Sequence, residues 1–175
     1  MTPDTCSRFV RNMVAIALFQ PDIPQNCGAI LRLSACLGLE THIVGPAGFD
    51  LSDRALRRAG LDYLERAAMT EHTGWTAFEA WRTSQPGCRL VLATTRGSVP
   101  YADFAFANDD IVLFGRESAG VPENVHQSVD ARVRIPMVTG LRSLNVATSA
   151  AMILGEALRQ TRTFPTAARP TEALS

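Results

Sequence analysis

The chain has 175 residues, 46% of them hydrophobic, which is enough for one domain with an ordinary apolar core. Its 17 basic and 17 acidic residues cancel to a net charge of zero, so charge alone gives no general attraction to nucleic acid. The apolar runs are too short to cross a membrane, and the first dozen residues lack the apolar core of a secretion signal. We therefore expect a cytoplasmic protein without a membrane segment.

The cysteine and histidine residues form no metal-binding pattern. The four cysteines lack C-x-x-C spacing, and the three histidines are isolated along the chain. Metal-binding motifs normally place at least two ligands together on one element. We therefore predict that the protein uses no metal and that its cysteines are reduced.

Strands and helices are predicted to alternate along the chain. Residues 1–12 are polar and unpatterned and are predicted to be a flexible extension. The predicted strands cover residues 13–19, 41–44, 65–69, 90–94, 110–114 and 132–135. The predicted helices cover residues 24–37, 52–58, 76–84, 122–127 and 146–158. The segment 163–175 is rich in Pro, Thr and Ala and is predicted to be a disordered tail.

This alternation predicts a single α/β domain over residues 13–162, with a mostly parallel sheet flanked by helices. Ligands of such sheets bind beyond the carboxyl ends of the strands. Glycines together with hydroxyl or charged residues follow Ala93, Phe114 and Ile135, which are three predicted strand ends. We expect these segments to meet at one edge of the sheet.

The segment between Ile135 and the last helix carries Arg142, Ser143 and Asn145 to the helix start, where backbone N–H groups lack internal partners. Taken alone, this loop is either a polar binding site or only a capped connection. The usual nucleotide motifs are absent: no G-x-G-x-x-G follows the first strand, and no P-loop occurs. A serine hydrolase is also unsupported, because no G-x-S-x-G occurs.

Three motifs stand out in order along the chain: N-x-G-x-x-x-R from Asn26 to Arg32, G-x-E-x-x-G from Gly115 to Gly120, and I-P-M with S-L-N from Ile135 to Asn145. Together they closely resemble the SpoU branch of the SPOUT RNA methyltransferases over about residues 13–160. The stretches at residues 19–26 and 56–63 are similar to a subgroup, the small tRNA (cytidine/uridine-2′-O)-methyltransferases that act on the wobble nucleotide. The resemblance implies S-adenosylmethionine as cofactor, a homodimer, and a deep trefoil knot in the C-terminal half.

The resemblance also implies roles for individual residues. The cofactor would be held by Ala93, Thr94, Thr95, Gly97, Gly115, Glu117, Gly120, Ile135, Met137 and Ser143. The catalytic positions would be Arg32, Asn26, Ser143 and Asn145. Contacts to the tRNA anticodon stem-loop are expected from Arg32, Arg57, Arg58 and Arg142.

Arg32 cannot be a free base, because a guanidinium stays protonated. We expect it to polarise the ribose 2′-hydroxyl, orient a phosphate and stabilise developing oxyanion charge; the alternative is a structural ion pair. Glu117 either faces the sulfonium or accepts backbone N–H bonds, and Asn145 can be a simple N-cap.

The predicted function is 2′-O-methylation of a tRNA ribose, at the wobble nucleotide. Alternatives are methylation at another tRNA or rRNA site, and a catalytically silent cofactor-binding RNA-assembly factor. An ordinary Rossmann-type oxidoreductase or hydrolase would need the glycine-rich first turn that this chain lacks.

Overall fold

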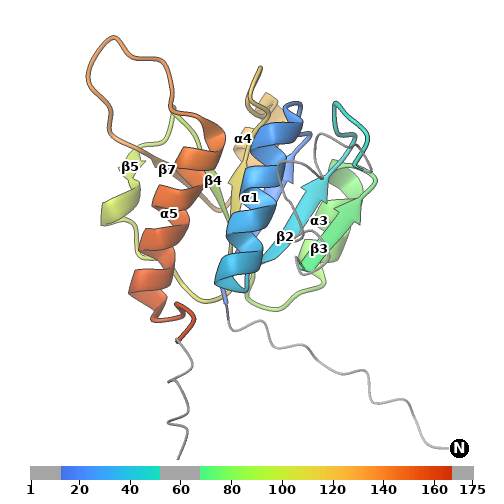
Figure 1. Cartoon of the computed structure of the whole chain (residues 1–175), viewed down its shortest axis with the longest axis horizontal. Coiled ribbons are helices and arrows are strands. Elements are labelled where there is room, and N and C mark those ends of the chain that lie inside the picture. The colour runs from blue at the N-terminus through green and yellow to red at the C-terminus, as the bar shows by residue number, and fades with distance from the viewer. Residues whose placement is uncertain (1–12, 52–67, 167–175) are drawn as a thin grey trace, which may run out of the picture.

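The computed structural model describes residues 13–51 and 68–166, which form a seven-stranded parallel sheet between two layers of helices (Figure 1). The strands are β1 (Ala15–Phe19), β2 (Glu40–Val44), β3 (Ala68–His72), β4 (Arg89–Ala93), β5 (Val99–Pro100), β6 (Asp110–Phe114) and β7 (Ala131–Arg134). Their order in the sheet is β3-β2-β1-β6-β4-β7-β5, and all the pairings are parallel. The mostly parallel sheet predicted from the sequence is confirmed.

The α-helices are α1 (Pro24–Leu37), α3 (Trp75–Thr83), α4 (Glu123–Ser128) and α5 (Val146–Thr161), and a 3-10 turn, η2, covers Tyr101–Asp103. Helix α1 begins with a proline at its first position and ends at Gly38, which has a φ of 68°. Proline there lacks only an N–H that would have no helical partner, and glycine adopts a positive φ without strain.

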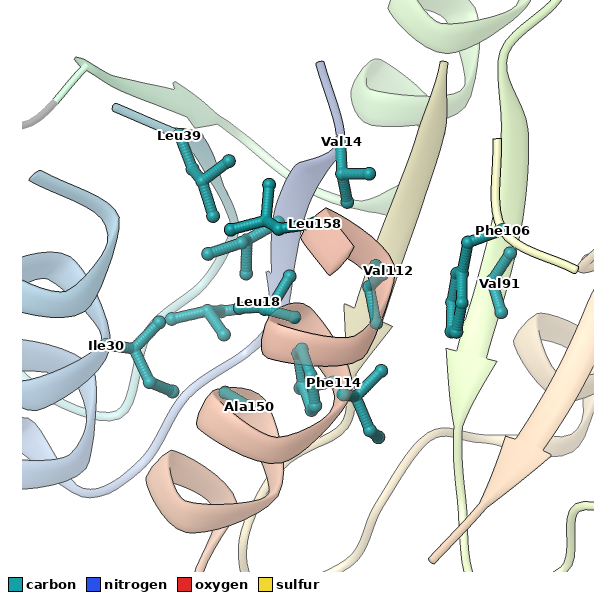
Figure 2. Close-up of a cluster of buried hydrophobic side chains, with 14 of the residues drawn as sticks. Val14, Leu18, Ile30, Leu39, Val91, Phe106, Val112, Phe114, Ala150 and Leu158 are labelled. Atoms are coloured by element: carbon teal, nitrogen blue, oxygen red, sulfur yellow. The ribbon is translucent and has the colours of Figure 1, made fainter. Parts of the chain in front are cut away.

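Each face of the sheet carries its own apolar cluster because side chains alternate along a strand. In β1, Ile16 and Leu18 pack with α1 and α5, whereas Ala17 and Phe19 pack with α3 and α4. Figure 2 shows the first cluster, where Ala150 and Leu158 of α5 lie over side chains of β1 and β6. Helices α1 and α5 therefore share one face, and α4 lies on the other.

Most predicted elements lie within one to three residues of the observed ones. The strand predicted at 65–69 is instead Ala68–His72, an edge strand whose mixed burial gives a weak apolar signal. The two-residue strand Val99–Pro100 and the turn at Tyr101–Asp103 were not predicted. The predicted helix 52–58 lies outside the described residues, as do the predicted flexible extension 1–12 and residues 167–175 of the predicted tail.

Within the described ranges, no helix combines the length and the hydrophobicity that a bilayer crossing would require. The same ranges hold no group of three or more His, Cys, Asp or Glu side chains arranged for a metal ion.

Candidate active site

A cavity of about 670 Å³ opens beyond the carboxyl ends of β4, β6 and β7. Strand β4 lies between β6 and β7 in the sheet, so the segments that follow these three strands become neighbours. Figure 1 shows the connection from β7 to α5 as a wide loop at the top of the view. The cavity thus forms at the edge of the sheet where the sequence predicted a ligand.

The structure brings most of the predicted site residues together. Those that line the cavity are Asn26, Ala93, Thr94, Thr95, Gly115, Glu117, Gly120, Ile135, Met137, Arg142, Ser143 and Asn145. Two predicted residues, Gly97 and Arg32, lie outside this lining. Arg57 and Arg58 lie outside the described residues.

A chain of hydrogen bonds connects the three sequence motifs. Asn145 Nδ2 donates to Asn26 Oδ1 at 2.9 Å, and Asn26 Nδ2 donates to Glu117 Oε1 at 3.1 Å. The other carboxylate oxygen of Glu117 accepts the backbone N–H of Asp22 at 3.1 Å. Glu117 therefore holds the loop after β1 against the loop after β6, as expected if it accepts backbone N–H bonds.

The start of α5 fixes the direction of this chain. Asn145 Oδ1 accepts the backbone N–H groups of Ala147 at 2.8 Å and Thr148 at 3.3 Å, so Asn145 is the N-cap of α5. A backbone N–H can only donate, so the Asn145 amide nitrogen must point toward Asn26. The Asn26 amide nitrogen must then point toward Glu117. Asn145 is therefore an N-cap, as one of its two predicted alternatives held, and it also takes part in the hydrogen-bond chain at the cavity.

Glu117 and Asp22 form a carboxyl pair at the end of this chain. Burial raises the pKa of Glu117, and its hydrogen bond with the Asp22 carboxyl raises it further. The same hydrogen bond lowers the pKa of Asp22, whose Oδ2 also accepts a hydrogen bond from Ser118 Oγ. Two carboxyl groups in hydrogen-bond contact share one proton more easily than they carry two charges.

Cys27 lies on α1 beneath the site and is buried. Burial and the nearby Glu117 charge raise the pKa of its thiol to about 12. The thiol therefore stays protonated at neutral pH, which excludes it as a nucleophile because the thiolate is the reactive form.

Two glycines allow backbone segments near the cavity to pack closely. A Cβ on Gly97 would lie 2.6 Å from the Val133 carbonyl carbon, and one on Gly115 would lie 2.6 Å from the Gly120 carbonyl carbon. The predicted reason for glycine at residue 115 was close approach to a ligand. The structure adds a different one, because the loop after β6 closes on itself there, as the Arg116–Gly120 bridge also shows.

Arg32 is exposed on α1 and does not reach the cavity wall. Asn26 and Arg32 are the two ends of the N-x-G-x-x-x-R motif, which lies on α1. Six residues at about 100° each leave them about 120° apart around the axis. Asn26 therefore lines the cavity while Arg32 faces outward from the same helix.

The sequence analysis gave no role to several residues at the cavity. Arg96, Val121, His126 and Ser149 also line it. Asp22 also had no predicted role; it is outside the lining but bonds to Glu117, and it lies in a proline-rich turn, where a carboxylate is usually only a turn residue. His126 belongs to none of the motifs, so no sequence signal could have identified it.

The cavity suits a ligand with an apolar ring and several polar groups. Its volume falls within the range of about 300–1,000 Å³ that is typical of small-molecule sites. The lining includes apolar side chains, such as Ile135 and Val121, and residues with hydroxyl groups, such as Thr94. A purine nucleoside that carries an amino acid group fits this combination of surfaces.

The family model described as "SpoU rRNA Methylase family" matches residues 13–155. The chain belongs to this SpoU family. The match includes all three motifs and every cavity-lining residue named above, so family membership and the geometry of the site rest on the same residues.

Individual relatives and solved structures agree with the SpoU match. The chain is 62% identical over 151 residues to a tRNA (cytidine(34)-2'-O)-methyltransferase of Ancylobacter novellus, covering 86% of this chain and 95% of that protein. A structure described as giving insights into the 2-OH methylation of C/U34 on tRNA has a TM-score of 0.82 and 37% identity, over 87% of this chain and 98% of that one.

A third similar protein is the SpoU methyltransferase AviRb from Streptomyces viridochromogenes, solved in complex with the cofactor AdoMet. It has a TM-score of 0.80 and 28% identity, over 90% of this chain and 64% of that one.

Proposed function

We propose that this protein transfers a methyl group from S-adenosylmethionine to the ribose 2′-oxygen of the wobble nucleotide in the tRNA anticodon. The observation that carries the proposal is the Glu117–Asn26–Asn145 hydrogen-bond chain, which joins all three SpoU motifs at one cavity. The similarity to a tRNA (cytidine(34)-2'-O)-methyltransferase at 62% identity supports the choice of nucleotide.

S-adenosylmethionine, when bound, supplies an electrophilic methyl group on a sulfonium. The residues that would hold it are the strand-end segments from Ala93 to Thr95 and from Gly115 to Gly120, together with Ile135, Met137 and Ser143. AviRb, a solved SpoU relative, was determined with AdoMet bound, which supports this choice of cofactor.

The chain's own residues would orient the ribose. Asn26 and Asn145 each have one amide hydrogen in the chain described above and a second hydrogen left for a ligand. Arg32 stays protonated but lies outside the cavity of its own chain. It would therefore reach the ribose from the partner protomer of a homodimer, where it would hold a phosphate and stabilise negative charge as the 2′-hydroxyl loses its proton. Positioning of this kind can supply several kcal/mol of the barrier reduction without a metal.

We also propose a homodimer in which α1 and α5 face the partner. Among the described residues, several exposed apolar side chains lie on the loop before α5, at the residue that precedes α1 and on α5 itself. They are Ile23, Val138, Leu141, Leu144 and Met152, with exposed fractions of 40%, 77%, 68%, 41% and 37%. Apolar surface of this kind marks protein interfaces. Arg32 is exposed on α1, so the partner would lie close to it.

We further propose that the segment from Ile135 to Asn145 closes a deep trefoil knot, and that the protein acts in the cytoplasm. The likeness to solved SpoU structures supports the knot. The anticodon stem-loop would contact Arg32, Arg57, Arg58 and Arg142. If these arginines neutralise phosphates, the affinity for tRNA falls steeply with salt.

The decisive experiment incubates the protein with tritiated S-adenosylmethionine and bulk tRNA, and then locates the methylated nucleotide by mass spectrometry of digested tRNA. We expect label in tRNA and a 2′-O-methylated wobble nucleotide. Label at another tRNA position would support the broader alternative of a different RNA site, as would label that appears only when rRNA is supplied in place of tRNA. Cofactor binding without any label would support the silent assembly factor.

A further inference from the structure

His126, in helix α4, presents an unsatisfied hydrogen-bond donor beside the cavity. Its ring lines the cavity, and its Nε2 atom is buried with no hydrogen-bond partner. A buried polar group without a partner is destabilising, because it has lost its hydrogen bonds to water and gained none in return. An unpaired buried group in a native protein needs an explanation, and the simplest explanation here is that a ligand in the cavity provides the missing partner.

The neighbouring Arg132 decides which ring nitrogen carries the proton. Arg132 Nε lies 3.3 Å from His126 Nδ1 and donates to the His126 carbonyl oxygen at 2.9 Å. Arginine has only donors, so Nδ1 must be the unprotonated, accepting nitrogen. In the neutral ring, Nε2 therefore carries the hydrogen, and it needs an acceptor.

The surroundings keep the ring neutral. Burial lowers the pKa of His126, and the positive charges of Arg96 and Arg132 lower it further, against a smaller opposite effect of Glu123. Arg96 also lines the cavity, where it pairs with Glu123 at 3.2 Å. A positively charged ligand group is unfavourable beside two arginines, so the partner of Nε2–H is an acceptor without positive charge.

The position of α4 identifies the part of the cofactor that would reach His126. Helix α4 packs on the face of the sheet opposite α1 and α5. Asn26 belongs to α1 and Asn145 caps α5, so the lining of the cavity includes residues from both faces of the sheet, the two asparagines on one side and His126 on the other. With the methyl group at the asparagines, the adenine base is the part of S-adenosylmethionine farthest from it.

We propose that His126 binds a ring nitrogen of the adenine through its Nε2–H, as an additional cofactor-binding residue that the SpoU motifs do not contain. This inference rests on the proposed function, because it takes S-adenosylmethionine as the ligand. Nε2 is buried in the structure, so the contact requires the ring to turn toward the cavity about χ2, a torsion that is broadly distributed for histidine.

Calorimetric titration of the full chain with S-adenosylhomocysteine and with methylthioadenosine tests the proposal. The second ligand keeps the adenosine and lacks the amino acid. We expect His126→Leu to weaken both ligands by about three- to tenfold, which is the usual worth of one neutral hydrogen bond. His126→Gln keeps an N–H donor and should bind nearly as the wild type does. Asn124→Leu, on the exposed side of the same helix, is the matched control.

Thermal unfolding of the ligand-free variants provides a second measurement. His126→Leu removes the buried donor and leaves Arg132 bonded to the backbone carbonyl, so its Tm should equal or exceed that of the wild type. A Tm lowered by several degrees would overturn the proposal in favour of a structural role.

Two binding results would also overturn the proposal: unchanged affinity in His126→Leu, or weakening confined to S-adenosylhomocysteine, which would place the contact at the amino acid. Failure of the wild type to bind either ligand would instead refute the proposed cofactor, and this inference with it.

Discussion

Asn145 Nδ2 donates to Asn26 Oδ1 at 2.9 Å across 119 residues of sequence, and the same Asn145 side chain caps helix α5. One side chain therefore joins the third motif to the first while it satisfies the helix terminus. Because the cap uses the oxygen and the motif contact uses the nitrogen, substitutions can separate the two roles.

Asn145→Ala should lower both stability and methyl transfer. Loss of an N-cap typically costs about 1 kcal/mol, and in a chain of this size that shifts Tm by about 2–4 °C. Asn145→Asp keeps the capping oxygen but cannot donate to Asn26, so it should retain the wild-type Tm and lose activity. Calorimetry and the tritium assay would measure the two effects. Equal activity of Asn145→Asp and the wild type would refute a role for the amide donor.

Glu117→Gln should reduce methyl transfer by about tenfold or more, since hydrogen bonds to a charged group are worth about 1.5–3 kcal/mol. Both Glu117 oxygens accept hydrogen bonds, and the glutamine amide nitrogen would face a donor in either orientation. The measurement is kcat/KM with tRNA. Glu71→Gln, exposed on the edge strand β3 and outside the cavity lining, serves as the control and should remain active.

The contributions of Asp22 and Glu117 to the stability of the fold should change with pH in opposite directions. The raised pKa of Glu117 means that its contribution to stability is complete below its ordinary pKa and is lost as pH rises through the raised value. The lowered pKa of Asp22 means that its contribution is present above its ordinary pKa and is lost as pH falls through the lowered value. The two groups together should therefore stabilise the fold most at pH values between the lowered pKa of Asp22 and the raised pKa of Glu117.

Asp22→Asn should lower the pKa of Glu117, because it removes the carboxyl hydrogen bond that helps to raise it. The pKa should stay above the ordinary range, since burial is the larger cause and persists. Carboxyl carbon NMR over a pH titration would measure this shift. An unchanged Glu117 titration would show that the two carboxyl groups are not coupled.

Gly97→Ala should destabilise the protein by about 1–3 kcal/mol, which is the usual cost of overpacking. Its Cβ would meet the Val133 backbone at 2.6 Å, where neither segment can easily move. Gly155→Ala is the matched control, because a Cβ added to Gly155 within α5 would meet nothing within 4 Å and alanine favours helices. Urea unfolding should show the two variants shifting in opposite directions.

Arg32→Ala should abolish methyl transfer and leave the affinity for S-adenosylhomocysteine unchanged. Arg32 lies outside the cavity wall and is exposed, so its removal should change the free energy of unfolding by about 0.5 kcal/mol or less. Activity and calorimetric binding would be measured on the same sample. A large loss of stability would favour the structural ion pair instead.

Local sequence patterns predicted the elements well where burial is complete. The strand at Asp110–Phe114 is buried throughout and has the predicted bounds. Helix α5 follows from the apolar spacing that includes Ile153 and Leu154, although it extends to Thr161. The prediction placed the edge strand Ala68–His72 three residues too early, because partial exposure weakens the apolar pattern.

The candidate site was predictable only through its motifs. Contacts between residues separated by 91 and 119 positions, such as Asn26–Glu117 and Asn26–Asn145, have no local signature. The three motifs identified the residues, and the predicted parallel sheet indicated that they lie at one edge of it. The sequence did not predict a role for His126 or for Asp22. His126 lies in a short helix and Asp22 in a turn, and neither has a distinctive spacing from other site residues.

The order of strands around the cavity has a consequence for folding. Strand β4 lies between β6 and β7, yet β7 is the last of the three in the chain and α5 follows it. The binding site is therefore incomplete until β7, the loop after it and α5 have docked. A ligand that binds only this finished arrangement stabilises the folded state by mass action. Cofactor affinity would then report on completed assembly of the protein during refolding as well as on the chemistry of the site.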